Sequence, residues 1–345
     1  MCSQFSRAKG YVKLYAFDGF LTTFMTCLLT IIFLMGFKWG INGYLSAIII
    51  TDALSSLFLF FSARLYKNIK FKGLDKRTFK MMLRYAIPMI PTTLLWWIVS
   101  VSDRYIITYM LGADANGLYA AAYKIPTIVV LVSTIFMDAW QVSAVSEIKD
   151  RKALAKFFSN VFRGYQSIIF LAGSLLIPFS KICTIILVAG DYYESWRYIP
   201  FLMLATIYNC MVQFMGSVYM IERKGVTTLV TSIIAAVTNI VGNFILIPIC
   251  GVNGAAYSTC FSYFIVFVIR AIHTRKFIRI NYSVLKFGVN AILTLAQAII
   301  MITEVPGWII YEVILTLLVL LLNIKVLILS FKKIVGRFGR KKAKT

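Results

Sequence analysis

The chain has few acidic residues and few charged residues of either sign. Its 345 residues include 13 Asp and Glu, 36 Lys and Arg and one His, so that only 14% are charged. Soluble domains carry about 25% charged and roughly 45–50% apolar residues. Here 60% are hydrophobic and the mean hydropathy is +0.82. A soluble core could not cover this much apolar surface, so we expect lipid to cover much of it.

The sequence also lacks the motifs of several enzyme classes. It contains no H-E-x-x-H, no G-x-S-x-G, no phosphate-binding P-loop and no paired carboxylates in an accessible loop. Its six cysteines form no C-x-x-C pair, and most fall within apolar runs, which favours a packing role. We therefore expect no catalytic residue, no metal, no cofactor and no ATP-driven step within this chain.

Long apolar runs are what the sequence has in abundance. A spanning helix takes about 20 apolar residues, and the runs do not alternate as the strands of a membrane barrel would. They predict an all-α integral membrane protein of about ten transmembrane helices. The runs cover residues 14–36, 43–64, 86–111, 117–138, 164–188, 198–221, 226–249, 254–272, 285–302 and 308–330.

The Lys and Arg residues behind the net charge of +23 are distributed unevenly between the two sides of the membrane. If the amino terminus is cytoplasmic and each run crosses once, 31 of the 36 Lys and Arg lie in cytoplasmic segments, as the positive-inside rule requires. This predicts that both termini of the chain are cytoplasmic. The basic carboxy-terminal tail is then expected to contact anionic membrane lipids and not nucleic acid.

One short pattern occurs twice, as G-I-N-G at 40–43 and G-V-N-G at 251–254. Each copy lies between two apolar runs, and six runs separate the first helix pair from the second. The repeat predicts units of six helices, the second complete and the first represented by its last two. We therefore expect ten helices of an original fourteen. Parallel repeats are common in transporters, whose substrate sites lie at the repeat interface.

This organisation predicts four segments. Residues 1–65 hold the last two helices of an amino-terminal lobe, and 66–84 form a basic cytoplasmic linker. Residues 85–275 form a six-helix carboxy-terminal lobe, and 276–345 hold two additional helices and the basic tail.

Two cations are predicted to lie at one depth inside the membrane. Arg104 is about seven residues from the outer end of its run, and Lys124 is seven or eight from the outer start of the next. At about 1.5 Å per residue, both lie roughly 10–12 Å below the outer surface. Trp97 shares the polar face of Arg104, and Asn209 and Gln213 lie on a polar stripe of run 198–221.

Polar stripes inside a membrane require a water-filled lumen or protein partners. A cationic lumen suits an anionic substrate, because Arg pairs with phosphate through a planar fork and Lys acts as a point charge. The alternative is that Arg104 and Lys124 form structural ion pairs with Asp103, Asp52 or Asp138. Asp52 and Asp103 are themselves candidates for ion or proton coupling, with packing or a helix-end role as the alternative for Asp52.

Several stretches resemble a known family. They are R-Y-A-I-P-M-I-P at 84–91, S-D-R-Y-I at 102–106, N-G-L-Y-A at 116–120, K-I-P at 124–126 and A-W-Q at 139–141. They resemble bacterial polysaccharide flippases of the multidrug/oligosaccharidyl-lipid/polysaccharide exporter superfamily, which includes O-antigen and capsule flippases.

The resemblance implies a MATE-like architecture of two six-helix lobes around a cavity, with two extra carboxy-terminal helices and, in this chain, an incomplete first lobe. It implies translocation of undecaprenyl-pyrophosphate-linked oligosaccharide from the inner to the outer leaflet of the bacterial plasma (inner) membrane. Arg104 and Lys124 fall on motif positions and would be the lumen cations. Membrane lipids and the polysaccharide polymerase and assembly machinery are the implied partners, with no nucleic acid.

Three other functions stay open. An ion-coupled drug or cation antiporter of the same superfamily would place carboxylates in its lumen, where cations dominate here. A membrane polysaccharide polymerase or glycosyltransferase would need a large external loop or an acidic nucleotide-sugar site, and neither is visible in the sequence. A scaffold with no transport role is conceivable for a chain with only part of its first lobe.

Overall fold

The computed structural model describes residues 2–68, 75–145, 150–188 and 190–342, and these residues form helices and turns only. The chain divides into two compact units, Met1–Phe79 and Lys80–Thr345. Each is described by itself below.

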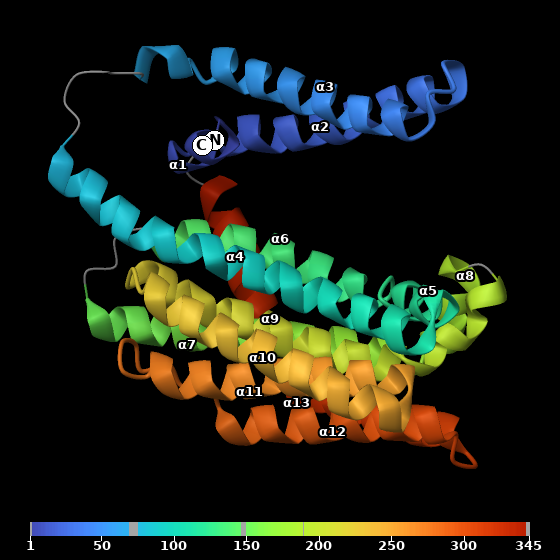
Figure 1. The fold of residues 1–345 in the computed structure, drawn as a ribbon. Helices are drawn as coiled ribbons and strands as arrows, with labels where there is room; N and C mark the ends of the chain where they lie inside the picture. The colour runs from blue at the N-terminus through green and yellow to red at the C-terminus, as the bar shows by residue number, and fades with distance from the viewer. Residues whose placement is uncertain (1, 69–74, 146–149, 189, 343–345) are drawn as a thin grey trace. The chain divides into compact units, whose positions relative to one another are not determined.

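Unit 1 consists of two long helices and their short extensions. Helices α2 and α3 lie side by side (Figure 1), and the rings of Phe17 and Phe58 meet between them with centroids 5.7 Å apart. The Ser55 hydroxyl donates to the Asp18 carboxylate at 2.8 Å. The elements are α1 (Cys2–Ala8), α2 (Val12–Ile31), the π-helical turn η1 (Ile32–Gly36), α3 (Gly40–Ser62) and the 3-10 turn η2 (Leu65–Asn68).

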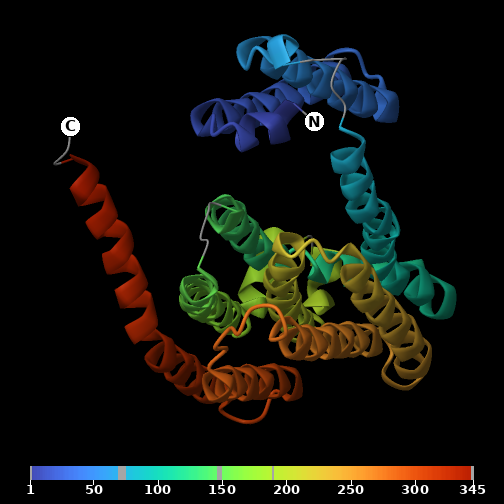
Figure 2. The same cartoon turned by 90° about the vertical axis from the view of Figure 1, so that its left-hand side faces the viewer.

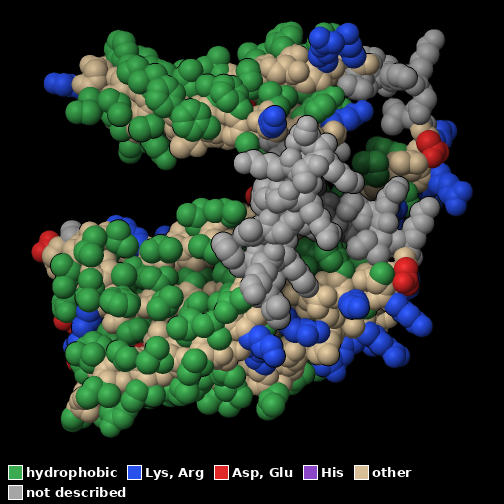
Figure 3. Space-filling view, turned by 180° about the vertical axis from the view of Figure 1, so that it is seen from behind, with side chains coloured by type: hydrophobic (Ala, Val, Ile, Leu, Met, Phe, Trp, Pro, Cys, Tyr) green, Lys and Arg blue, Asp and Glu red, His purple; other side chains and the backbone are tan. Residues whose placement is uncertain are grey.

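Unit 2 is a bundle built from the rest of the chain (Figures 1 and 2). Hydrophobic side chains cover the flank of the unit seen in Figure 3, and Lys and Arg gather toward its ends, as expected for a surface that faces lipid between two aqueous phases. The elements are α4 (Lys76–Leu111), α5 (Ala113–Ala122), α6 (Pro126–Val145), α7 (Arg151–Leu176), α8 (Ser180–Leu187), η3 (Gly190–Arg197), α9 (Ile199–Ile221), α10 (Gly225–Cys250), α11 (Val252–Thr274), α12 (Val284–Thr303) and α13 (Trp308–Lys342).

The predicted membrane spans are present. Among the described residues, eight helices are long and apolar enough to cross a membrane, and ten if each of two bent pairs counts as one span. The first pair, α5 and α6, bends by 46° at the break before Pro126, where proline cannot supply a backbone donor. The second pair, α7 and α8, bends by 76°. The all-α membrane fold with about ten spans is therefore confirmed.

Helix α4 begins earlier than the sequence predicts. Its first residue is Lys76, so residues 76–84 are helical where a linker was expected. Asp75 caps it: the carboxylate accepts from the Thr78 hydroxyl at 2.6 Å and from the backbone N–H of Arg77 at 3.0 Å. These hydrogen bonds favour the charged carboxylate and hold the pKa of Asp75 below its ordinary value. An N-cap signal outweighed the basic composition from which the linker was predicted.

Helix α9 forms the centre of unit 2. Phe214 stacks with Trp140 of α6 at 5.4 Å and with Tyr165 of α7 at 5.5 Å between ring centroids. The Tyr165 hydroxyl pairs with that of Ser133 at 2.5 Å and donates to the backbone oxygen of Cys210 at 3.2 Å. Close aromatic packing and interhelical hydrogen bonds are what hold helices together where lipid removes the hydrophobic driving force.

The last two helices pack on the α7 side of the bundle. Phe287 of α12 meets Phe170 of α7 at 5.3 Å and Phe267 of α11 at 4.5 Å, and α13 extends beyond the other helices of the unit in Figure 2. At the α12–α13 turn, Lys181 of α8 forms an ion pair with Glu304. The same ammonium lies 4.4 Å from the Trp196 ring and 5.2 Å from the Trp308 ring.

The two G-x-N-G copies have the same local geometry. Gly40 (φ 56°) opens α3 and Gly251 (φ 61°) precedes α11, and both occupy the left-handed region that favours glycine. The second glycines are both buried against the preceding helix end. A Cβ on Gly43 would meet Trp39 Cβ at 3.0 Å, and a Cβ on Gly254 would meet the backbone oxygen of Leu246 at 2.2 Å. The pattern therefore marks one tight turn used twice.

This turn yields a prediction for stability. Gly254→Ala places a methyl group inside the contact distance of a backbone oxygen that cannot move aside, so we expect a loss of about 1–3 kcal/mol. Thermal or SDS unfolding of the purified protein measures it. Gly288→Ala in α12 is the matched control, because nothing lies within 4 Å of its Cβ position. An equal effect of the two substitutions would contradict the packing role of Gly254.

Candidate functional site

A buried carboxylate lies in the middle of unit 2. Asp103 of α4 is 1% exposed and faces α5, α10 and α11. A charged group buried away from water is costly unless it is paired or hydrogen-bonded. In the part of the chain that the structure describes, Asp103 forms no ion pair. The cost must therefore be met by neutral donors.

Four buried side chains supply these donors. Both carboxylate oxygens are used, each by two donors, which is close to the full capacity of a carboxylate. The donors are Tyr119 Oη at 2.7 Å and Thr259 Oγ1 at 2.6 Å to Oδ2, and Asn239 Nδ2 at 3.0 Å and Asn243 Nδ2 at 2.6 Å to Oδ1.

The two asparagines are held differently. The Oδ1 atom of Asn239 accepts from the Ser102 hydroxyl at 2.8 Å, and its backbone oxygen accepts from Ser258 at 2.8 Å, so the Asn239 amide is fixed. Asn243 Oδ1 is buried and has no partner. The Asn243 amide is therefore oriented by its Nδ2, which donates to Asp103 at 2.6 Å and lies 3.4 Å from Asn239 Oδ1.

Glycine allows this cluster to close. Gly242 lies between the two asparagines on the face of α10 toward α11, and a Cβ there would lie 2.4 Å from Ser258 Oγ. The close approach of the two backbones is what brings Thr259 within 2.6 Å of Asp103.

The oxygens next to the Asp103 carboxylate are those of the Tyr119 and Thr259 hydroxyls. Oxygen is the ligand type that hard ions or a proton require, which makes Asp103 a candidate for ion or proton binding. A monovalent cation would neutralise the single buried charge. Among the described residues, no group of three His, Cys, Asp or Glu side chains exists that could hold a metal ion of higher charge.

The predicted lumen cations lie outside the Asp103 cluster. Arg104 and Lys124 are both exposed on unit 2, and the Arg104 guanidinium lies 5.9 Å from the ring centroid of Tyr123, the neighbour of Lys124. Neither cation forms an ion pair with another described residue. Asp103, one of the three carboxylates considered as their partner, is occupied by Tyr119, Thr259 and the two asparagines.

The predicted polar stripes differ in exposure. On α4, Trp97 and Arg104 share one exposed face, as expected from their spacing. On α9, Gln213 is exposed and Asn209 half-buried, whereas the stripe ends at Thr206 and Ser217, which are 6% and 3% exposed. Since α9 is the central helix, most of its polar stripe serves packing within unit 2. The substrate-binding role of Trp97, Asn209 and Gln213 stays a prediction.

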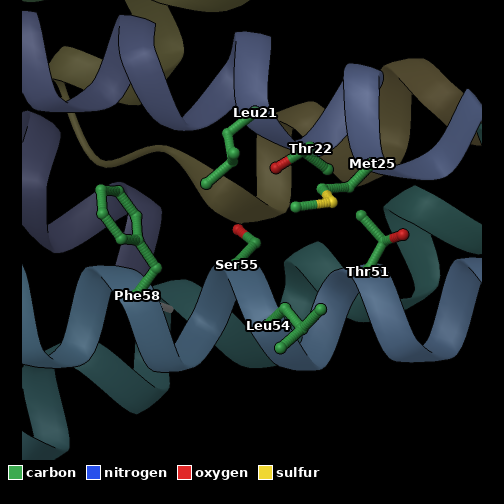
Figure 4. Close-up of a pocket in the computed structure, with 7 residues that line it drawn as sticks. All are labelled: Leu21, Thr22, Met25, Thr51, Leu54, Ser55 and Phe58. Carbon is green, nitrogen blue, oxygen red and sulfur yellow. The ribbon is translucent and has the colours of Figure 1, made fainter. Parts of the chain in front are cut away.

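Unit 1 contains the other carboxylate candidate. Asp52 of α3 is exposed, and its coupling role also stays a prediction. The buried carboxylate of this unit is Asp18, 6% exposed, which accepts from Ser55. A mostly apolar hollow lies between α2 and α3 beside it (Figure 4), lined by Leu21, Thr22, Met25, Thr51, Leu54, Ser55 and Phe58.

A basic cleft lies at one end of unit 2, where α4 meets the α9–α10 turn. It is lined by three exposed cations, Arg84, Arg223 and Lys224, together with Tyr85 and the first turn of α10. Gly225 opens that helix, and a Cβ there would lie 2.9 Å from the backbone oxygen of Tyr85. Cations beside a helix amino terminus form a favourable environment for a phosphate group.

Sequence reasoning missed most of the Asp103 cluster. It noted Asp103 but not Tyr119, Asn239, Asn243 or Thr259 as its partners. Two signals were available: asparagine is costly in a spanning helix, and Asn239 and Asn243 are four residues apart and so share one face of α10. Sequence reasoning also counted Arg270 among the cytoplasmic basic residues and did not predict that it is buried. It is 2% exposed and donates to Thr231 and to the backbone oxygen of Val212.

Part of the chain is similar to a known protein family. Residues 18–141 match the model of a family described as "Polysaccharide biosynthesis protein", which confirms the resemblance seen in the sequence. The matched part contains Asp103, Arg104, Tyr119 and Lys124. No curated protein matches the chain.

Solved structures of MATE and MOP superfamily transporters share the fold. An outward-facing multidrug resistance MATE family transporter of the MOP superfamily superposes with a TM-score of 0.68 at 13% identity, covering 80% of this chain and 64% of that one. A MOP superfamily transporter from Pyrococcus furiosus gives 0.65 at 12%, covering 79% and 65%. A Vibrio cholerae MATE transporter gives 0.66 at 14%, covering 79% and 64%. The chain thus spans less than two thirds of the length of these structures.

The donor arrangement yields a prediction. Asn243→Ala removes a hydrogen bond to a buried charge, so we expect a loss of about 1–3 kcal/mol in the free energy of unfolding. In an Asp103→Asn background the cost should fall, because the group left without a partner is then neutral. SDS unfolding of the four proteins of this double-mutant cycle measures the coupling. Asn160→Ala, at an exposed position of α7, is the control, and additive effects of the two site substitutions would contradict the contact.

Proposed function

We propose that this chain translocates undecaprenyl-pyrophosphate-linked oligosaccharide from the inner to the outer leaflet for surface polysaccharide synthesis, driven by a cation that binds at Asp103. The observation that carries the proposal is the family match over residues 18–141. The matched part holds both the buried carboxylate and the two exposed cations. In this proposal the chain lies in the bacterial inner membrane with both termini cytoplasmic.

The substrate would be held by its pyrophosphate. Arg104 and Lys124 are exposed cations without a carboxylate partner among the described residues. Tyr123 lies under the Arg104 guanidinium and restricts its motion. Charge-assisted hydrogen bonds from such a pair to phosphate oxygens are the strong class of protein hydrogen bonds. Trp97 is exposed on the same face of α4, two turns before Arg104, and offers a surface for sugar rings.

The basic cleft supplies a second cationic station. Arg84 and Arg104 are 20 residues apart on α4, which corresponds to about 30 Å, the thickness of the hydrocarbon core. In the proposed topology the basic cleft lies at the cytoplasmic end. Its cations, Arg84, Arg223 and Lys224, would therefore bind the pyrophosphate first. It would then be released near Arg104 and Lys124 toward the outer leaflet.

Coupling would run through α4 itself. Asp103 and Arg104 are consecutive residues, so their side chains point about 100° apart around the helix, one into the bundle and one outward. A cation bound at Asp103 neutralises the charge around which α4, α5, α10 and α11 are packed. Its arrival and departure can therefore change the packing of α4, which carries the substrate cation.

An ion-coupled drug or cation antiporter is the second candidate, favoured by the shared fold with multidrug MATE structures. A cationic substrate requires exposed carboxylates in its path. The exposed charges on the corresponding faces of α4 and α5–α6 are instead Arg104 and Lys124. For the Pyrococcus furiosus transporter, the reverse polarity of the binding pocket is said to suggest a different function. One fold is therefore compatible with binding pockets of either charge.

The substrate site can be tested by complementation. In a bacterial strain without its polysaccharide flippase, the wild-type chain should restore surface polysaccharide. Arg104→Ala and Lys124→Ala should each weaken pyrophosphate binding about 10- to 100-fold and reduce rescue accordingly. Arg104→Lys should recover part of the rescue, and Lys152→Ala, an exposed cation at the start of α7, should leave it unchanged. Full rescue by Arg104→Ala would remove this residue from the substrate site.

Coupling needs a separate measurement. Asp103→Asn keeps the shape and the hydrogen-bonding capacity of the side chain but removes its charge. We expect it to fold, to bind the lipid-linked substrate and to lose transport driven by a cation gradient in reconstituted vesicles. Substrate movement by Asp103→Asn at the wild-type rate under the same gradient would rule out this carboxylate as the coupling site.

A further inference from the structure

A second buried carboxylate lies in unit 2, in the pair of carboxy-terminal helices. Glu312 of α13 is 1% exposed. It lies between α12 and α7, and it shares no partner with Asp103. Within the described residues Glu312 forms no ion pair, and Lys181 at the α12–α13 turn is paired with Glu304.

The hydrogen bonds around Glu312 converge on one amide. Gln297 Nε2 of α12 lies 3.0 Å from Glu312 Oε2, 2.9 Å from Thr316 Oγ1 and 3.2 Å from the backbone oxygen of Ser174 in α7. An amide nitrogen has two hydrogens, so it cannot serve three acceptors fully. Thr316 sends its own hydrogen to the same Ser174 oxygen at 3.3 Å.

Three further oxygens in this place have no partner. Glu312 Oε1, Gln297 Oε1 and Ser174 Oγ are all buried and unpaired, and Gln297 and Ser174 are both 0% exposed. Each orphaned buried acceptor costs on the order of 1–3 kcal/mol. Native proteins fill such places with a donor, an ordered water or an ion. The cluster carries one negative charge and an excess of acceptors, and a bound cation would satisfy both.

A half-turn of the Gln297 amide completes the arrangement. The rotation exchanges Nε2 for Oε1 at nearly the same position. An oxygen would then lie about 3 Å from Glu312 Oε2, from Thr316 Oγ1 and from the Ser174 backbone oxygen, and the single hydrogen of the Thr316 hydroxyl cannot serve all of them. A small cation among these oxygens satisfies all of them. One positive charge neutralises Glu312, whereas a divalent ion would leave an unpaired charge in the membrane.

We propose that Glu312, Gln297, Ser174 and Thr316 form a Na⁺ site that joins α12 and α13 to α7. The site is separate from Asp103, and Na⁺ binding to it does not depend on whether the chain moves a glycan. Bound Na⁺ favours the packed position of α13 on α7, because without it the carboxylate between the three helices has an unpaired oxygen. The C-terminal helix pair is then held in place by an ion as well as by packing.

The helix pair carries a second polar layer that fits this role. Asn323 Nδ2 of α13 donates to Asn290 Oδ1 of α12 at 2.9 Å, and both residues are 0% exposed. Asn290 and Asn323 are each seven residues, about 10 Å, from Gln297 and Thr316 on their helices, so they lie on the same face. Asn290 Nδ2 and Asn323 Oδ1 are also unpaired. The interface is polar over several turns, as required if an ion is to reach Glu312.

Na⁺ binding to the purified full chain in lipid nanodiscs tests the proposal. Radioactive Na⁺ is titrated at equilibrium, and the stoichiometry is compared between wild type, Glu312→Gln and Glu304→Gln. Glu312→Gln keeps the shape of the side chain and should remove one bound Na⁺. Glu304→Gln removes a half-exposed carboxylate from the turn between the same two helices and should remove none. The same loss is expected in an Asp103→Asn background, so failure of the proposed coupling site leaves this result readable.

Ser174→Ala covers the case in which Glu312→Gln does not fold. It leaves the charge in place and removes one neutral oxygen, so Na⁺ affinity should fall about tenfold with unchanged stoichiometry. Na⁺ should also raise the unfolding temperature of the wild type more than that of either variant, whereas K⁺ at equal ionic strength separates specific binding from screening. Equal Na⁺ stoichiometry and affinity in wild type, Glu312→Gln and Ser174→Ala would overturn the proposal.

Discussion

The desolvation of one carboxylate governs the arrangement of unit 2. Asp103 is buried in a membrane protein where water cannot reach it, so its charge must be met by protein donors. Four donors from α5, α10 and α11 converge on it at 2.6–3.0 Å. That convergence fixes the rotation of each helix about its axis more tightly than apolar packing does, because lipid-facing and core-facing aliphatic side chains are interchangeable while hydrogen-bond donors are not. The exposed position of Arg104 follows from the buried position of its neighbour.

The two buried acids divide the bundle into parts with different chemistry. Asp103 is fully supplied with donors and leaves one amide oxygen, on Asn243, without a partner. Glu312 is poorly supplied and leaves three oxygens unpaired around it. Between them lies α9, packed through Phe214 and Tyr165 with aromatic contacts that carry no charge. In the two proposals, one cation binds at Asp103 and another binds between the α12–α13 pair and α7. No residue is common to both clusters, so the two sites would respond independently to changes in ion concentration.

The sequence predicts the helices well and the side-chain partners poorly. Hydropathy places spans such as 198–221 within a residue of α9, Ile199–Ile221, because burial in lipid imposes a minimum length. The G-x-N-G repeat predicts two equivalent turns because glycine adopts φ of 56° and 61° without the steric cost that a side chain brings. The start of α4 was misplaced, since composition favoured a linker and the Asp75 cap was overlooked. Tyr119 and Thr259 are 140 residues apart in sequence, and no periodicity within one helix shows that they share a carboxylate. Arg270 and Glu312 look like helix-end charges in sequence, and only the packed neighbours show that they are buried.

The tight contact at Gly242 has a consequence for ion selectivity. The missing side chain lets the α10 and α11 backbones approach until Ser258 fills the space where a methyl group would be. The spacing of the four donors around Asp103 is therefore set by a residue that donates no hydrogen bond to it. Preference between a bare proton, Na⁺ and a larger alkali ion depends on the size of a site as much as on ligand identity. In the proposed mechanism, exchange of small residues along this helix pair would change the driving ion while every side chain around Asp103 stayed the same.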